Sequence, residues 1–546
     1  AMNKLFKYIS VLTLAAVFAG AANDVSGERM REHVKYLSSD KLEGRGVGTR
    51  GEKLATEYIA EQFRAAGAKP AGDNGTYFQR VPMIGAATEP SASLSAALST
   101  GPRNHPVSFR WLDDFVGVTE LQQTAVQFDA EAIFVGHGIV APEFQWDDFK
   151  GVDVKDRVLV LFTNEPPSND PKFFGGPALT YYGRWTYKYE EAARHGAKAV
   201  FIIHTTPTAG YGFEVVRSSW SGEDPQLKLP AGKSALAFAG WFTKDAAEKV
   251  LAMSGHNVDE LLEKANSRDF HPIPLGIHIR GNMPTKIRQI ESRNVVAKVE
   301  GSDDKLRSEA VVFTAHWDHL GIGPAVNGDS IYNGAVDNAT GCAMLIEMAR
   351  TWAALPQKPK RSAIFVAVTA EEAGLRGSEY YAAHPAIPLG KTALDINFDA
   401  FPPFGPTKDL EVTGADRTTV WPIVRDTAQE MHITLAPEAH PEQGEYYRSD
   451  HFSLAHAGVP SFSIEQGTDY PGKPADYGKK LFEDYNDKRY HQPSDEYQDD
   501  WNFGGMEQVA HFAMQIATAV ANQNGLPTWR AGDEFLPARE KSFGRK

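Results

Sequence analysis

Four strand-like runs in the second half of this chain each end in a side chain that can bind a metal ion. The runs are short and largely apolar, and they lie at 310–315, 363–370, 394–398 and 461–464. The side chains that follow them are His316, Glu371 with Glu372, Asp399, and Glu465. In open parallel sheets, ligands lie beyond the carboxyl ends of the strands, in one crevice. Because the runs alternate with helical patterns, the sequence predicts an α/β fold with a metal-competent crevice at one sheet edge.

Two further candidates lie on turns. Asp337 precedes a helix expected over 342–352, where a carboxylate can bridge two ions or cap the helix. Taken alone, Asp337 is at least as well explained by a role as the N-cap of this helix. When His316 and the glutamate pair are also considered, a role as a metal ligand becomes the stronger interpretation. His491 lies in a loop at 490–495, where a histidine has no obvious core to fill.

The adjacent glutamates Glu371 and Glu372 follow a run that reads as a buried strand. Burying a carboxylate costs several kcal/mol unless it is paired or bound to a metal. Two divalent cations would balance both charges, so that one glutamate could bind metal while its neighbour holds a proton. For these two residues alone, an exposed pair at a helix start is an equally good interpretation.

Composition limits the classes of protein that this chain can belong to. Its 546 residues are 42% hydrophobic, and at about 150 residues per domain they predict two to four domains. The formal net charge of −14 disfavours a nucleic-acid partner, which normally requires a basic face. The single cysteine, Cys342, sits in an apolar helical pattern and is expected to be a packing residue. Nothing in the sequence indicates an oligomeric state.

The first 22 residues read as an export signal. Lys4 and Lys7 precede an apolar run at 8–18, and small residues follow at 19–22. This pattern predicts a periplasmic or secreted protein, with an uncleaved anchor as the alternative. No later segment reaches the roughly 20 apolar residues of a membrane span, so no span is expected after signal removal.

Five motifs together resemble metallopeptidase family twenty-eight, the co-catalytic zinc family of secreted bacterial aminopeptidases, aminopeptidase Y and the glutamate carboxypeptidases. They are His-Trp-Asp at 316–318, Val-Asp-Asn-Ala-Thr-Gly at 336–341, Thr-Ala-Glu-Glu-Ala-Gly at 369–374, Asn-Phe-Asp at 397–399 and Tyr-His at 490–491. Their order and approximate spacing match the family over about 285–525. The resemblance implies a zinc-exopeptidase (phosphorylase/hydrolase-like) fold, which is a three-layer αβα sandwich around a mixed, mostly parallel sheet.

The resemblance also implies five metal ligands. Asp337 would bridge two zinc ions. Glu372 and His491 would complete the site of one ion. His316 and Asp399 would complete the site of the other. Manganese or cobalt could substitute for zinc in such a mixed oxygen and nitrogen set.

The resemblance also implies catalytic roles for three more residues. Glu371 would be the general base and proton shuttle. Asp318 would fix the tautomer of His316, and Tyr490 would stabilise an oxyanion. The alternative histidine ligands fall outside the family pattern and are less favoured; they are His319, His451 and His456.

Residue patterns along the chain, together with this resemblance, predict five segments. Residues 1–22 are the signal, 23–127 the N-terminal part of the peptidase domain, 128–284 an insert, 285–525 the catalytic domain and 526–546 a polar C-terminal tail. The insert resembles a protease-associated α/β domain, through Lys-Tyr-Glu-Glu-Ala-Ala at 188–193 and Gly-Ala-Lys-Ala-Val at 196–200. The expected activity is that of an aminopeptidase acting on peptides. The alternatives are a carboxypeptidase, dipeptidase or amidase of the same fold, and, less favoured, a glutaminyl cyclase or a non-catalytic binding protein.

Overall fold

The centre of the molecule is a parallel group of four strands. The computed structural model describes residues 24–100 and 106–544, so the expected signal at 1–22 lies outside the described residues. β14 (Ala310–His316) lies between β17 (Ser362–Val368) and β18 (Thr392–Asn397), and β18 also pairs with β21 (Ser461–Gln466). All three pairings are parallel. The carboxyl ends of these strands therefore lie at one edge of the sheet, as the sequence predicted.

Antiparallel strands extend this sheet on both sides and make it mixed. On one side β13 (Ile273–Val299) pairs with β17, and β2 (Phe78–Thr88) pairs with β13. On the other side β19 (Asp409–Thr413) runs antiparallel to β21, and β20 (Thr434–Ala436) runs parallel to β19. The expectation of a mixed, mostly parallel sheet is confirmed.

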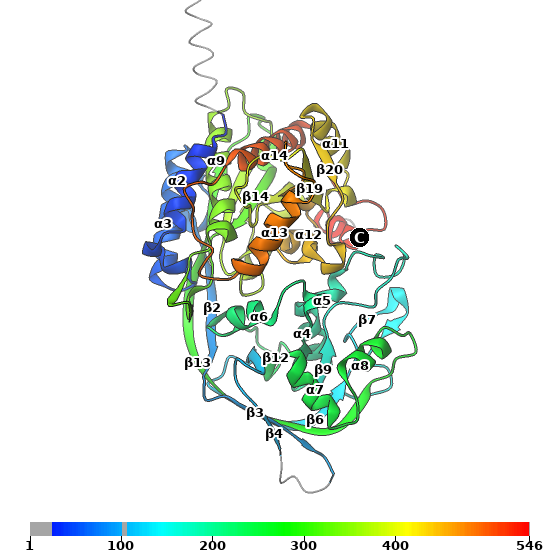
Figure 1. Cartoon of the computed structure of the whole chain (residues 1–546). Helices are drawn as coiled ribbons and strands as arrows, with labels where there is room; N and C mark the ends of the chain where they lie inside the picture. Colours follow the sequence, from blue (N-terminus) through cyan, green and yellow to red (C-terminus); the bar gives the residue numbers. More distant parts are fainter. Residues whose placement is uncertain (1–23, 101–105, 545–546) are drawn as a thin grey trace, which may run out of the picture.

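Helices cover both faces of this sheet, giving three layers. Along β14, Val311, Phe313 and Ala315 pack into one apolar core, whereas Ala310 and Val312 pack into another. The first core contains α2 (Gly27–Leu37), α3 (Arg50–Ala65), α9 (Gly341–Ala354) and α14 (Gly504–Asn522) (Figure 1). The second contains residues of α10 (Arg376–Ala383) and α12 (His451–His456). A strand buried on both faces has no polar alternation, which explains the continuous apolar runs in the sequence.

A second sheet forms the lower half of the molecule in Figure 1. The pairings give the order β4 (Val107–Phe109), β3 (Ser93–Leu98), β13, β6 (Ala125–Phe134), β9 (Val158–Phe162), β10 (Ala199–Ile203), β12 (Phe238–Phe242) and β5 (Phe115–Val118). Its two faces are covered by α4 (Trp185–Arg194) with α6 (Phe213–Trp220), and by α7 (Lys244–Ala252) with α8 (Val258–Ala265). We call this part the second module.

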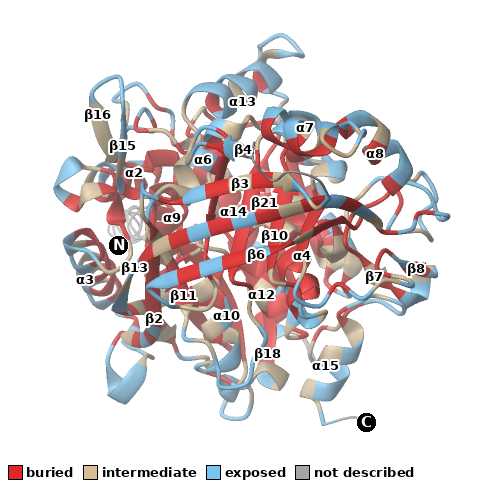
Figure 2. Ribbon diagram, turned by 90° about the horizontal axis from the view of Figure 1, so that it is seen from below, coloured by how far each residue is buried: buried red, intermediate tan, exposed pale blue. Residues whose placement is uncertain are grey.

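The long strand β13 joins the two sheets. Its 27 residues pair in the second sheet up to Pro284 and in the first sheet from Thr285 onward. Figure 2 shows buried and exposed residues alternating along β3 and the first part of β6, where the helices do not cover one face of the second sheet. β3 to β5 come from the segment expected to belong to the peptidase domain, yet they pair in the second sheet. The domain boundaries and the protease-associated identity of the insert stay predictions.

We call the first sheet and the helices that cover it the first module. The C-terminal segment packs against the first module more closely than its polar sequence suggests. Trp529 is buried and donates a hydrogen bond from Nε1 to the Gly458 carbonyl at 3.0 Å. In α15 (Leu536–Ser542), the buried Arg539 donates to the carbonyls of Pro527 and Leu389. Within the described residues, every helix is too short or too polar to cross a membrane.

Candidate metal centre

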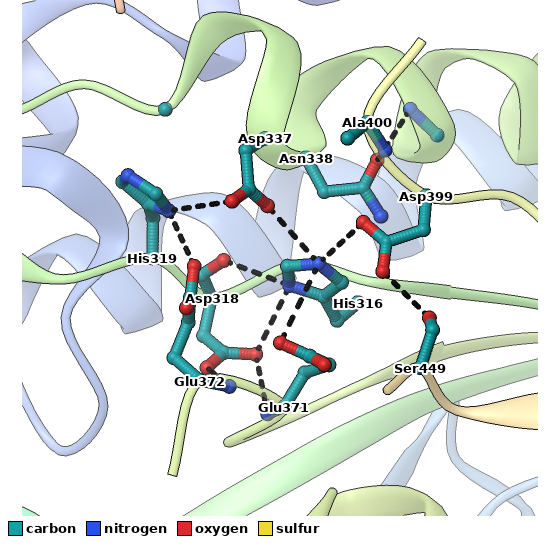
Figure 3. A network of polar contacts seen from close by, with 12 residues as sticks. His316, Asp318, His319, Asp337, Asn338, Glu371, Glu372, Asp399, Ala400 and Ser449 are labelled. Carbon is teal, nitrogen blue, oxygen red and sulfur yellow. Dashed lines mark hydrogen bonds and ion pairs between the residues drawn. The ribbon is translucent and has the colours of Figure 1, made fainter. Parts of the chain in front are cut away.

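The five residues expected to bind metal meet at the carboxyl edge of the first sheet. His316 ends β14, and Glu372 and Asp399 follow β17 and β18. Asp337 lies in η6 (Ala335–Thr340), just before α9, and His491 lies in the loop after α13 (Tyr477–Lys488). His316 and Asp399, which are 83 residues apart in the chain, are brought together because the parallel strands share an edge (Figure 3).

Asp337 stands between two histidine and carboxylate pairs. Its Oδ1 lies 3.3 Å from Nε2 of His316, and that nitrogen is 3.1 Å from Oδ1 of Asp399. Its Oδ2 lies 3.3 Å from Nε2 of His491, and that nitrogen is 3.0 Å from Oε2 of Glu372. The two oxygens of one carboxylate therefore face two separate donor sets, the arrangement that a bridging ligand requires.

Backbone and hydroxyl contacts present the Nε2 atoms of both histidines to the carboxylates. Nδ1 of His316 donates to the backbone carbonyl of Asp318 at 3.1 Å. The Ser219 hydroxyl donates to the Val215 carbonyl, so at 2.9 Å it accepts a hydrogen bond from Nδ1 of His491. With Nδ1 protonated in both rings, each Nε2 has its lone pair free for a cation.

Asp318 acts differently from the expectation. Its carboxylate lies 3.7 Å from Nδ1 of His316, beyond hydrogen-bond distance, so its main-chain oxygen holds the imidazole instead. The carboxylate accepts hydrogen bonds from the backbone N–H groups of Glu371 and Glu372, at 3.2 and 3.4 Å. Asp318 therefore fixes the loop that carries both glutamates.

The adjacent glutamates have opposite proton affinities. Burial raises the pKa of Glu371 well above its ordinary value; the charge of His316 opposes this, and the carboxylates of Asp399 and Glu372 reinforce it. Burial also raises the pKa of Glu372, but His491 and His319 outweigh it and bring the value to about 2. One glutamate is thus an ionised ligand candidate, while its neighbour holds a proton readily.

Two residues that contact the metal ligands were not assigned to the site from the sequence. Nδ1 of His319 lies 2.6 Å from Oε1 of Glu372 and 4.0 Å from Oδ2 of Asp337, although the family pattern disfavours this histidine. The Ser449 hydroxyl donates to Oδ2 of Asp399 at 2.6 Å, a contact that no local motif signals. The other alternative histidines, His451 and His456, pack against aromatic rings of a separate cluster.

The second module reaches this site at two points. Ser219, in α6, contacts His491 as described above. Trp185, the first residue of α4, lies against Gly374 in the glutamate loop, where an added Cβ would come within 3.4 Å of the indole. The ring centroid of Tyr490 lies 4.1 Å from that of the His491 imidazole, and burial raises the pKa of the Tyr490 phenol well above the usual range.

The fourth strand end does not join this set. Glu465, at the end of β21, lies with Glu411 and Glu445, and their oxygens are within 4.8 Å of one another. Across the described ranges, no hydrogen bond or ion pair links Glu465 to the five residues at the centre. Cys342, expected to pack in the core, is buried, and burial raises the pKa of its thiol to about 12.

The donor set fits a pair of divalent cations. Four mostly buried carboxylates cluster here, those of Asp337, Glu371, Glu372 and Asp399. In the part of the chain that the structure describes, the only ion-pair partners of these carboxylates are histidines. Nε2 atoms of His319 and His491 are buried without a hydrogen-bond partner. Buried charge of one sign is unstable unless it is balanced, and mixed nitrogen and oxygen donors suit zinc.

Comparison with known proteins agrees with the fold. Residues 294–517 match the family model described as Peptidase family M28. A probable zinc metalloprotease of Pyrenophora tritici-repentis is 42% identical over 89 residues, 16% of this chain and 17% of that protein. A probable leucine aminopeptidase 2 of Aspergillus oryzae is 36% identical over 107 residues, 19% of each chain. The aligned segments thus span less than a fifth of these curated relatives.

Among solved structures, the aminopeptidase from Aneurinibacillus sp. strain AM-1 is similar with a TM-score of 0.53 and 19% identity, over 93% of this chain and 97% of that one. The likeness to this structure shows an α/β fold of the same kind, and the family match is to a family of peptidases. More particularly, residues 294–517 match Peptidase family M28 over about two fifths of the chain. The family resemblance predicted from the five motifs is confirmed.

Proposed function

We propose that the protein is an exported, zinc-dependent exopeptidase, and that it acts as an aminopeptidase on the N-terminal residues of peptides. The observation that carries the proposal is the position of Asp337, whose two oxygens face two histidine and carboxylate pairs. His316 and Asp399 would hold one ion with Asp337, and Glu372 and His491 would hold the other. His319 also approaches Glu372 and Asp337, but His491 is preferred because it matches the family motif and its Nε2 lies 3.3 Å from Asp337, against 4.0 Å for Nδ1 of His319.

Bound zinc ions would supply Lewis acidity and lower the pKa of a water molecule toward roughly 7. The protein's own contribution centres on Glu371, whose Oε2 lies 3.9 Å from Nε2 of His316. Its raised pKa suits a group that takes a proton from water during attack and returns it to the leaving amine. The protonated phenol of Tyr490 would donate a hydrogen bond to the developing oxyanion.

A substrate panel tests the proposal. Purified protein would be incubated with aminoacyl nitroanilides, N-blocked peptides and C-amidated peptides, with and without a chelator. We expect cleavage of free-amine substrates only, and its loss when the chelator is present. Cleavage restricted to peptides with a free carboxylate would instead assign the protein to the carboxypeptidases, and activity that persists in the chelator would remove metal from the reaction.

Export is a separate part of this proposal and rests on residues 1–22. Cell fractionation followed by N-terminal sequencing tests it. We expect the mature chain in the periplasm or medium, beginning after the small residues at 19–22; a cytoplasmic chain with its first residues intact would contradict export.

A further inference from the structure

A small cavity between the two modules contains two arginines. The cavity measures about 30 Å³ and is lined by residues of both modules, among them Arg184, Trp185, Tyr211, Trp241 and Arg448. Arg184 immediately precedes α4 of the second module, and Arg448 lies in the turn before α12 of the first. Because a water molecule needs roughly 10–15 Å³ of such space, the cavity accepts a group of about two oxygen atoms.

The two arginines lack acidic partners in this cavity. Within residues 24–100 and 106–544, neither guanidinium lies within 4.0 Å of a carboxylate oxygen. Nε of Arg184 is buried without a hydrogen-bond partner, and Arg448 donates from Nη2 to the Ala209 carbonyl at 3.2 Å. Burial and the charge of Arg448 lower the pKa of Arg184 to about 10, although Tyr211 and Glu371 oppose this. The charge of Arg448 opposes the burial that raises the pKa of Glu445, although the two side chains form no ion pair.

The cavity borders the reacting centre. Trp185, which follows Arg184, packs against Gly374 only two residues beyond Glu372. Glu371 is among the charges that act on Arg184, and Tyr211 is among the groups that act on Tyr490. A ligand held in the cavity would therefore lie next to Trp185, which contacts the loop that carries the proposed general base.

We infer that Arg184 and Arg448 form an anion subsite that binds a carboxylate of the substrate beside the reacting centre. This inference rests on the proposed peptidase function and specifies its substrates. Guanidinium forks match the planar geometry of a carboxylate, and two like charges that face a desolvated cavity are stabilised by an anion. The carboxylate has two sources: the C-terminus of a short peptide, or an acidic side chain next to the scissile bond.

Matched peptide pairs separate these sources. The first pair is Leu-Gly-Gly and its C-terminal amide; the second is Leu-Glu amide and Leu-Gln amide. In the native protein we expect kcat/KM to be at least about ten-fold higher for the charged member of one pair, since a charge-assisted hydrogen bond contributes about that factor. The pair that shows the preference identifies the source. Equal values in both pairs would overturn the inference while leaving the peptidase proposal intact.

Variants assign the preference to the two arginines. Arg184→Gln and Arg448→Gln should each bring the charged-to-neutral ratio of kcat/KM toward one, and Arg184→Lys should restore part of it. Arg217→Gln is the matched control, because Arg217 is an exposed arginine of α6 that donates to the Leu112 carbonyl. Unfolding temperatures would verify that each variant is folded. A ratio unchanged in both glutamine variants would contradict the assignment.

Binding measurements test the anion subsite independently of peptide hydrolysis. Calorimetry with the Glu371→Gln variant, in which turnover is expected to be lost, compares the Kd values of the same peptide pairs. Tighter binding of the charged member, abolished by adding Arg184→Gln, supports the subsite even if the native protein hydrolyses none of the peptides. Equal Kd values within both pairs would refute it.

Discussion

At the scale of single residues, the chemistry depends on charges that only the fold brings together. Asp337 could be recognised in the sequence because its neighbours match a motif, and the structure places its two oxygens opposite two histidines. Ser449 and His319 could not be recognised in this way. Their importance comes from contacts with Asp399 and Glu372, which lie 50 and 53 residues away in the chain.

The different roles proposed for the adjacent glutamates, Glu371 as general base and Glu372 as metal ligand, lead to the first prediction. Glu371→Gln should retain zinc but lower kcat by about 10²- to 10⁴-fold, because the amide cannot accept the proton that a general base removes. Steady-state kinetics and elemental analysis of the same sample measure both properties. Glu379→Gln, an exposed glutamate of α10, is the control. Full activity in the Glu371→Gln variant would exclude Glu371 from proton transfer.

At the scale of elements, the buried strands and helices of the first module were largely predictable. Continuous apolar runs indicated strands covered on both faces, and the structure places helices on both faces. The C-terminal segment was less predictable, because Arg539 reads as a surface residue although its guanidinium is satisfied by carbonyls of distant loops. Hydrogen bonds of this kind depend on tertiary contacts, which cannot be read from a single sequence.

The packing of α3 on β13 leads to a prediction for stability. Glu52 of α3 is buried, accepts a hydrogen bond from the Ser292 hydroxyl at 3.0 Å, and has its pKa raised by burial from 4.5 to about 7. Between these two pH values the folded state keeps a proton that the unfolded state releases. Stability therefore falls as the pH rises from about 4.5 to about 7, by roughly 3 kcal/mol for this group.

Glu52→Gln should remove this loss, because glutamine resembles the protonated side chain. We expect the variant to unfold at a higher temperature than the native protein at pH 8 and at a similar temperature at pH 5. Glu57→Gln, on an exposed position of the same helix, is the control and should not show this difference. A Glu52→Gln variant less stable than the native protein at pH 8 would contradict the assigned pKa shift.

At the scale of the whole molecule, the second module completes the site in a way that local patterns could not predict. β13 carries the chain between the two sheets, and residues of α4 and α6 then reach the loops of the first module. The sequence suggested an inserted α/β domain at 128–284. It could not show that Ser219 contacts His491, because the two residues are 272 positions apart.

This contact between modules leads to the third prediction. Ser219→Ala removes the hydrogen-bond acceptor for Nδ1 of His491 and should weaken zinc binding by about ten-fold or more, the usual effect of losing a partner of a metal-bound imidazole. Competition with a chelator of known affinity measures the change. Ser221→Ala is the matched control, because its hydroxyl donates to the Ser218 carbonyl close to the same helix end. Unchanged zinc affinity in Ser219→Ala would show that α6 does not position the ligand.

The number of zinc ions bound per chain tests the central claim most directly. Native protein and an Asp337→Ala variant would be loaded with zinc, freed of excess metal and subjected to elemental analysis. We predict two ions per native chain and less than one in the variant, because both donor sets share the Asp337 carboxylate. A native chain that stays free of zinc, or a variant that retains both ions, would contradict the account.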